Sequence, residues 1–264
     1  MHRDPVPELR RPSPSKLSGL SIVLPCFNEQ ENVATAVREA TAAAELVADA
    51  HEVIVVDDGS SDGTLDAALA EAVLDPRVQV VVHEVNRGYG AALRSGMGAA
   101  RYEWIFLTDS DLQFDLRDLR LFVPLTTSHD LLMGFRMRRR DPWHRRVNAR
   151  AWNWLVRRTL HVPVGDVDCA FKLIRRDLVE QLTLTAEGAT ISPELVAKAD
   201  HAGARICELG VHHRPRVAGQ QSGANPRVVA RAMRELRELH GELARTPAPA
   251  PAPVPAPQTR PVRT

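Results

Sequence analysis

The chain has 264 residues, a formal net charge of +1, and 44% hydrophobic and 25% charged residues. This length suits one large α/β domain or two small domains, and the near-neutral charge argues against a protein that binds polyanions over its whole surface. Three widely spaced cysteines, Cys26, Cys169 and Cys207, favour a reducing compartment over a disulfide framework or a zinc site.

The two ends of the chain differ in composition from its middle. Residues 1–17 are charged and proline-rich and contain no apolar core, so they predict a disordered lead rather than a signal peptide. Residues 245–264 alternate Ala and Pro and predict an extended, unpacked tail. No run of 18 apolar residues occurs, so no membrane-spanning helix is expected. The predicted folded domain is therefore residues 18–244.

The middle of the chain alternates short apolar runs with helical patterns. An apolar run near Leu20 ends at Pro25 and predicts a buried strand, and Asn28 is the expected N-cap of the helix that follows. Further strands are predicted over 52–56, 78–82, 103–107 and 130–134. Helices are predicted over 65–74 and from the glycine-rich segment that begins at Asn86. This alternation indicates an α/β fold with a mostly parallel sheet that helices cover on both faces.

Polar residues follow several of the predicted strands directly. Ligands of such sheets bind beyond the carboxyl ends of the strands, where these side chains are expected to meet. The residues are Pro25, Asn28, Glu29, Asp57, Asp58, Gly59, Asn86, Arg87, Gly88, Asp109, Asp111 and Arg136. Their predicted convergence is stronger evidence for a ligand site than any single member.

The stretch TDSDLQFD, residues 108–115, places Asp109 and Asp111 two positions apart after a predicted buried strand. Neighbouring carboxylates stay ionised at low cost when a cation lies beside them. Oxygen ligands favour Mg²⁺ or Mn²⁺, which also take ligands from substrate phosphates. The pair therefore predicts a metal site that holds a diphosphate. Asp115 has an alternative role as the cap of a helix beginning DLRDLRLFV.

The segment DDGSSDGT, which follows the second predicted strand, has two interpretations. Asp58-Gly59 and Asp62-Gly63 are common turn pairs, whereas adjacent acids at a strand end suit hydrogen bonds to a nucleotide base or ribose. Two other nucleotide-binding classes are excluded, because NRGYGAAL lacks the full dinucleotide fingerprint and the P-loop pattern is absent.

Seven motifs occur in the order and spacing of the family 2 glycosyltransferases with the GT-A fold. They are VLPCFNEQENV, VVDDGSSDGT, NRGYGAALRSGM, TDSDLQFD, GFR, DVDCAFKLIRRDL and HHRPRVAGQQSG, and the match covers about residues 20–239. The sequence most resembles the dolichyl- or polyprenyl-phosphate mannosyl- and glucosyltransferases. It departs from their pattern at Ala170, which stands in place of the usual glycine before the aromatic residue.

The resemblance implies roles for individual residues. The metal ligands would be Asp109, Asp111 and Gln113, and the catalytic residues would be Asp109, Asp111, Arg136 and Asp166. The donor-binding residues would be Pro25, Phe27, Asn28, Glu29, Asp57, Asp58, Arg87, Gly88, Asp109 and Arg216, with Arg216 and Gly219 in a loop that closes on the donor. The acceptor side would include Arg136, Arg146, Arg150, Asp168 and Lys172, and Asn153 and Arg157 also fall in register.

The resemblance further implies a metal-dependent, inverting transfer of mannose or glucose from GDP-mannose or UDP-glucose to a polyprenyl phosphate. The acceptor phosphate is already an anion, so this reaction needs no dedicated base. Transfer to a hydroxyl would need a carboxylate base, for which Asp166, Asp168 and Glu194 are the candidates. A third hypothesis is a non-catalytic binding subunit, and the intact D-x-D-x-Q pattern argues against it.

Residues 136–158 contain nine arginines and one aspartate, together with Trp143, Trp152 and Trp154. Arginine combined with tryptophan suits the surface of an anionic membrane and a phosphate head group. A solvated basic helix is the alternative interpretation. No nucleic-acid motif accompanies the patch, so nucleic acid is not an expected partner. The pattern thus predicts a protein peripherally associated with the cytoplasmic face of the cell membrane.

The segment NPRVVARAMRELRELHGEL predicts a capped amphipathic helix near the end of the folded domain. Its apolar stripe comprises Val228, Val229, Met233, Leu236 and Leu239. Such a stripe can pack on its own domain, lie on a membrane or dock a membrane-protein partner, and packing on the domain is the favoured interpretation.

Overall fold

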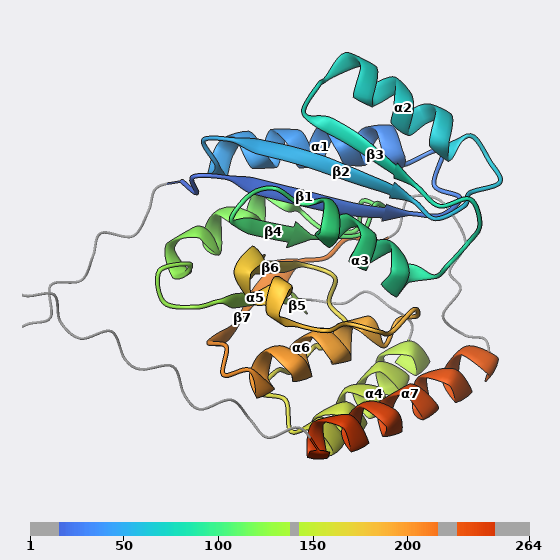
Figure 1. Ribbon diagram of the computed structural model, residues 1–264, viewed down its shortest axis with the longest axis vertical. Coiled ribbons are helices and arrows are strands. Elements are labelled where there is room, and N and C mark those ends of the chain that lie inside the picture. The colour runs from blue at the N-terminus through green and yellow to red at the C-terminus, as the bar shows by residue number, and fades with distance from the viewer. Residues whose placement is uncertain (1–15, 138–142, 216–225, 246–264) are drawn as a thin grey trace, which may run out of the picture.

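The computed structural model describes residues 16–137, 143–215 and 226–245, and a seven-stranded sheet lies at its centre (Figure 1). The order across the sheet is β3-β2-β1-β4-β6-β5-β7. The strands are β1 (Leu20–Cys26), β2 (His51–Asp57), β3 (Val78–Val82), β4 (Trp104–Leu107), β5 (Leu131–Met137), β6 (Lys172–Arg175) and β7 (Ile206–His212).

Four of the six strand pairs in this sheet are parallel: β1 with β2, β1 with β4, β2 with β3, and β5 with β7. β6 runs antiparallel to both of its neighbours, β4 and β5. The predicted mostly parallel α/β sheet is therefore confirmed. β6 and β7 were not predicted, and β6 joins the parallel N-terminal strands to the C-terminal pair.

Helices cover both faces of the sheet, as Figure 1 shows. One face packs against α1 (Val33–Val47), α2 (Thr64–Leu74) and the 3₁₀ helix η1 (Leu116–Leu121), which η2 (Val123–Leu125) follows. The other face packs against α3 (Tyr89–Ala99), α4 (Trp143–Leu160), α5 (Arg176–Gln181), α6 (Ile191–His201) and α7 (Pro226–Arg245). The apolar faces of these helices and the apolar strands form one hydrophobic cluster on each side.

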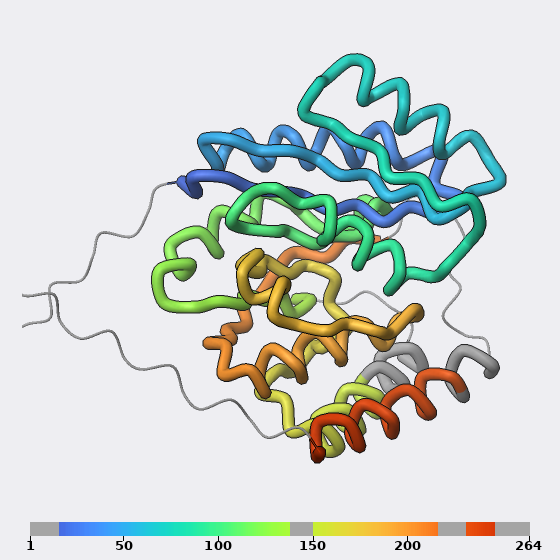
Figure 2. Tube along the Cα trace, viewed as in Figure 1, coloured from blue at the N-terminus to red at the C-terminus, as the bar shows by residue number. Residues whose placement is uncertain are grey.

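The amphipathic helix α7 packs on its own domain, which was the favoured interpretation. It lies beside α4 and α6, and its Leu236 and Leu239 are buried (Figure 2). Val228 and Val229 lie in α7, but their side chains fall outside the described part. The predicted lead and tail fall outside it apart from Lys16, Leu17 and Arg245, and Arg245 is the last residue of α7. Leu17 is buried and forms a bridge with Ala48, and Lys16 donates to the carbonyl of Glu45 at 2.8 Å, so these two residues pack on the domain.

Two local predictions at the end of β1 are wrong. Pro25 does not end the strand but lies inside it, opposite Val56 of β2. The pairing of β1 with β4 stops at Val23, so the missing N–H of Pro25 costs no bond on that side. Asn28 is not a helix cap, because α1 begins at Val33 with Asn32 in the N-cap position.

Within the described ranges, no helix combines the length and the apolarity needed to cross a membrane.

Candidate active site

The carboxyl ends of β1, β2 and β4 meet at one edge of the sheet, where the sequence predicted a ligand site. The hydroxyl of Ser110, which follows β4, donates to the carbonyl of Pro25 in β1 at 3.1 Å. The pKa of the Cys26 thiol is raised to about 12, mainly by burial; the carboxylates of Glu29, Asp57 and Asp109 contribute to the rise, and a hydrogen bond with Ser110 opposes it. Acids that are far apart in sequence therefore surround the end of β1 together.

The loop after β4, residues 108–115, carries the predicted metal ligands. Asp109 is half-buried, and its Oδ1 accepts a hydrogen bond from the Tyr89 hydroxyl at 2.9 Å. Asp111 is buried, and its Oδ1 accepts from the backbone N–H of Gln113 at 3.2 Å. Leu112, which lies between Asp111 and Gln113, has φ +60°, a left-handed conformation that costs a side-chain-bearing residue about 1–2 kcal/mol. A strained turn thus holds the two carboxylates in place.

The end of β7 fixes the far side of this loop. Phe114 forms an antiparallel bridge with His213, and the Gln113 side-chain amide donates to the carbonyl of Arg214 at 3.1 Å. Asp115 accepts from the backbone N–H of Arg117, so its predicted capping role is confirmed, although the helix it caps is the 3₁₀ helix η1.

Strand β6 brings a buried cation to the acids. Lys172 pairs with Leu107 at the end of β4 and is only 1% exposed. Its ammonium donates to the Cys169 carbonyl and, at 3.1 Å, to the Ser192 hydroxyl. Burial lowers the pKa of Lys172, while the nearby carboxylates of Asp168 and Asp109 oppose that shift. Lys172 therefore lies close to the carboxylates of Asp109 and Asp168.

An ion pair between Arg136 and Asp166 forms the next part of the site. The guanidinium of Arg136, at the end of β5, donates to both carboxylate oxygens of Asp166 at 2.8 and 2.6 Å. Burial lowers the pKa of Arg136, but the Asp166 carboxylate outweighs burial, and the net direction is upward. Arg136 is therefore a permanent, oriented cation beside the acids.

Hydrogen bonds from backbone N–H groups to the side chains of Glu208 and Asn153 hold the segment from Gly165 to Asp168. The N–H groups of Gly165 and Asp166 donate to the Glu208 carboxylate at 2.8 and 2.9 Å, and that of Val167 donates to Asn153 Oδ1 at 3.1 Å. Burial raises the pKa of Asp168. Asn153, Asp166, Asp168 and Lys172 thus lie in one part of the fold.

The loop after β1, which the sequence predicts to bind the donor, contacts the loop after β2. Asn28 has φ +55°, and its Oδ1 accepts from the Ser61 N–H at 2.8 Å. The Glu29 N–H donates to the Thr64 hydroxyl at 2.8 Å. Phe27, at the tip of the first loop, is 47% exposed. This geometry leaves an aromatic ring accessible above a rigid pair of loops.

Asp57 and Asp58 are both buried, but their surroundings differ. The Asp58 carboxylate, 3% exposed, accepts from the backbone N–H groups of Arg87 (3.0 Å) and Gly88 (2.8 Å) and contacts His83 Nδ1 at 2.6 Å. Asp57 Oδ1 has no hydrogen-bond partner among the described residues. Asp58 therefore shapes the loop that starts α3.

Several predicted residues lie elsewhere or outside the described part. Arg216 and Gly219 lie outside it, as does the side chain of Arg146. Arg150 is exposed on α4. Three further residues contact predicted site residues but were not predicted from the sequence: Tyr89, His83 and Glu208. Tyr89 lies within the quoted NRGYG motif, but no spacing rule connects a tyrosine there to an acid twenty residues later.

The carboxylates at this edge fit a divalent cation. Within the described ranges, no group of three or more His, Cys, Asp or Glu side chains is arranged to hold a metal by itself. Mg²⁺ typically uses one or two carboxylates and takes its other ligands from water and substrate phosphates. Asp109 and Asp111 match that pattern, and the buried Thr108 Oγ1 beside them has no hydrogen-bond partner among the described residues. The donor set is all oxygen, as Mg²⁺ and Mn²⁺ prefer.

Solved structures with a similar fold include glucosyl-3-phosphoglycerate synthase from Mycobacterium tuberculosis. Its complex with phosphoglyceric acid has a TM-score of 0.66 and 23% sequence identity, covering 85% of this chain and 80% of that chain. Its complex with Mn²⁺ and uridine-diphosphate-glucose has a TM-score of 0.64 and 21% identity, covering 86% and 79%. At this identity the likeness establishes the fold alone, and it confirms the predicted GT-A architecture.

Several curated relatives carry the name undecaprenyl-phosphate 4-deoxy-4-formamido-L-arabinose transferase. The protein of this name from Enterobacter sp. (strain 638) is 30% identical over 213 residues, and that from Yersinia pestis (strain Pestoides F) is 32% identical over the same length. Each alignment covers 80% of this chain and 64% of the relative, so the chain spans less than two thirds of their length. The family model for glycosyl transferase family 2 matches residues 21–183, and the chain therefore belongs to that family.

Proposed function

We propose that the protein transfers a sugar from a nucleotide sugar to a polyprenyl phosphate, and that Mg²⁺ or Mn²⁺ is required. The observation that carries the proposal is that Asp109, Lys172 and the Arg136–Asp166 ion pair lie at the carboxyl edge of the sheet, after β4, at the start of β6 and at the end of β5. The curated relatives support a polyprenyl-phosphate acceptor by name. Mannose or glucose is the expected sugar, although the relatives' names specify an L-arabinose derivative.

The proposed reaction is a displacement at the anomeric carbon. An oxygen of the acceptor phosphate forms the new bond to that carbon, while the bond to the nucleoside diphosphate breaks and the leaving oxygen keeps the electron pair. A divalent cation held by Asp109 and Asp111, with Gln113 as the third predicted ligand, would neutralise charge on the leaving diphosphate. Arg136 would contact a phosphate, and attack opposite the leaving group would invert the configuration.

Donor recognition is proposed for the two loops that follow β1 and β2. Phe27 presents an exposed ring, which suits stacking on a nucleotide base. The buried Asp57 Oδ1 lacks a hydrogen-bond partner among the described residues. It is suited to accept a hydrogen bond from an N–H or O–H group of the nucleotide. GDP-mannose and UDP-glucose are the expected donors.

Two of the three candidate bases, Asp166 and Glu194, are poorly suited to deprotonating a hydroxyl acceptor. Asp166 is paired with Arg136. The Glu194 carboxylate accepts hydrogen bonds from the N–H groups of Thr185 and Ala186 and from the Lys198 ammonium. Burial raises the pKa of Glu194, but these hydrogen bonds outweigh burial, and the net direction is downward. A carboxylate held this way is a weak base. Asp168, with its raised pKa, is the base that a hydroxyl acceptor would require.

Helix α4 supports peripheral association with an anionic membrane. It contains five arginines and no acidic residue, and its Trp154 is 66% exposed. Arg150, Arg157 and Arg158 are exposed as well. Guanidinium groups attract anionic head groups, and an exposed indole favours the interface. This face would bring the site to its lipid acceptor.

A donor screen tests the proposal. The purified full chain is incubated with Mn²⁺ or Mg²⁺, a panel of radiolabelled nucleotide sugars and a short polyprenyl phosphate, with Asp111→Ala as the control. We expect metal-dependent label in the organic phase with one donor and none with the variant. Label that appears only on a water-soluble acceptor would contradict the lipid acceptor. A chain that binds no donor would contradict the transferase proposal altogether.

A further inference from the structure

Tyr89 contacts a predicted metal ligand but has no role in the proposed reaction so far. It is the first residue of α3, and its hydroxyl donates to Asp109 Oδ1 at 2.9 Å. A tyrosine hydroxyl keeps its proton at neutral pH, so it donates this hydrogen bond to the carboxylate. The ring therefore connects the start of one helix to the carboxylate at the end of β4.

The backbone on both sides of Tyr89 is fixed by close contacts. Gly88 has φ +97°, its N–H donates to Asp58 Oδ2 at 2.8 Å, and a Cβ there would lie 2.5 Å from the carbonyl oxygen of Glu187. The Gly90 N–H donates to the same carbonyl at 2.8 Å. A Cβ on Gly90 would clash with the carbonyl of Ala186. These contacts leave Tyr89 a single backbone position.

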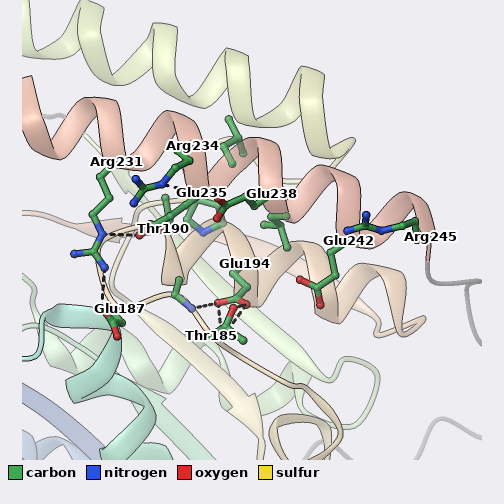
Figure 3. Close-up of a pocket in the computed structure, with 14 residues that line it drawn as sticks. Thr185, Glu187, Thr190, Glu194, Arg231, Arg234, Glu235, Glu238, Glu242 and Arg245 are labelled. Carbon is green, nitrogen blue, oxygen red and sulfur yellow. Dashed lines mark hydrogen bonds and ion pairs between the residues drawn. The ribbon is translucent and has the colours of Figure 1, made fainter.

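The segment that packs against α3 is itself anchored by α6 and α7. Glu194 of α6 accepts from the N–H groups of Thr185 and Ala186 at 2.8–3.0 Å. The Glu187 carboxylate pairs with Arg231 of α7 at 2.9 Å. Figure 3 shows these side chains along a cleft of about 440 Å³ between the segment and α7. The support of Tyr89 thus comes from the C-terminal half of the chain.

We propose that Tyr89 is a positioning residue that fixes the Asp109 carboxylate for the divalent cation. A hydroxyl bound to one carboxylate oxygen sets the orientation of the other oxygen, and such supporting hydrogen bonds strengthen metal binding. The inference rests on the proposed function, since it takes Asp109 as a metal ligand. It adds a determinant of metal affinity that does not itself touch the metal or the substrate.

The test is the affinity for Mn²⁺ of Tyr89→Phe, which removes the hydroxyl and keeps the ring. Free Mn²⁺ is measured by electron paramagnetic resonance during titration of the full chain, once with saturating UDP and once with saturating GDP. We expect roughly 10-fold weaker Mn²⁺ binding with the nucleotide that supports binding to the wild type. Tyr102→Phe is the matched control, because the Tyr102 ring packs against Gly19. Loss of the Tyr102 hydroxyl should leave the affinity for Mn²⁺ unchanged.

A second pair of variants separates positioning from the hydroxyl itself. Gly90→Ala keeps Tyr89 but displaces the start of α3, so it should also weaken Mn²⁺ binding. Gly98→Ala, on the same helix with nothing near its Cβ position, should not. Equal Mn²⁺ affinity of wild type and Tyr89→Phe would overturn the positioning role while leaving the proposed metal site intact. A wild type that binds no Mn²⁺ with either nucleotide would overturn both.

Discussion

Two pairs of acids follow parallel strands of the same sheet and look alike in the sequence, yet the fold uses them differently. After β2, the Asp58 carboxylate is surrounded by the N–H groups of Arg87 and Gly88 and by His83. After β4, Asp109 and Asp111 lie on a strained turn beside the buried ammonium of Lys172. The first pair contains a structural acid that shapes a loop, and the second pair has the surroundings of a ligand site.

The difference shows how the partners of a carboxylate indicate its role. An acid that accepts several backbone hydrogen bonds has its charge satisfied within the protein and contributes to stability. Neighbouring carboxylates at a sheet edge repel each other, and a divalent cation bound together with a diphosphate relieves that repulsion. The following variants test this contrast, from the largest expected effect to the smallest.

Asp111→Asn should abolish function with little loss of stability. Removing one carboxylate of the proposed metal site should lower transfer to polyprenyl phosphate by roughly 10²–10³-fold, the typical effect of removing one electrostatic stabiliser of a transition state. Product formation and chemical denaturation are measured on the same preparation. Full activity of this variant would remove Asp111 from the site.

Asp58→Asn should show the opposite pattern. The amide can accept only on one side, and its NH₂ group would face an N–H group or the imidazole of His83. Because Asp58 is buried, the free energy of unfolding should fall by about 2–3 kcal/mol. Urea denaturation measures this fall. Unchanged stability would mean that the loop after β3 does not depend on Asp58.

Gly90→Ala and Gly98→Ala should differ in the sign of their effect on stability. A Cβ at Gly90 clashes with backbone, so the free energy of unfolding should fall by about 1–3 kcal/mol. Gly98 is exposed with open space around it, so alanine should stabilise α3 by about 0.5–1 kcal/mol. Denaturation curves of both variants test the pair, and a stabilising Gly90→Ala would contradict the close contact.

Asp115 should make a small, pH-dependent contribution. Hydrogen bonds from Arg117 are the largest cause that holds the pKa of Asp115 below its usual value, and Arg214 adds to them. A lowered folded-state pKa stabilises the protein above the unfolded pKa of about 3.9, and this stability is lost as the pH falls through the folded-state pKa. Asp115→Asn keeps a cap but loses the charge.

At neutral pH, Asp115→Asn should therefore be less stable than the wild type by under about 1 kcal/mol, because both arginines are largely exposed to solvent. The difference should shrink progressively below about pH 4. Denaturation of both proteins across this pH range is the measurement. A constant difference at every pH would assign the effect to capping rather than to charge.

Long apolar strands and strand-end acids were predictable from the sequence, whereas short strands and local caps were not. Strand β6 has only four residues, follows a loop and begins with a buried lysine. No apolar pattern in the sequence therefore predicts it. β7 is half-buried along most of its length and has a mixed pattern. Asn28 has the side chain of a helix cap, but its contact with Ser61, thirty-three residues later, sets its conformation instead.

By itself, the sequence determined the α/β class, the mostly parallel sheet and the acids of the candidate site, because periodicity and strand-end chemistry are local properties of the chain. Only the tertiary structure decided which acids are structural, where Lys172 and Arg136 lie, and that Tyr89 contacts Asp109. Those outcomes depend on contacts between residues far apart in the chain. The antiparallel insertion of β6 between β4 and β5 creates several of them, and no local pattern encodes it.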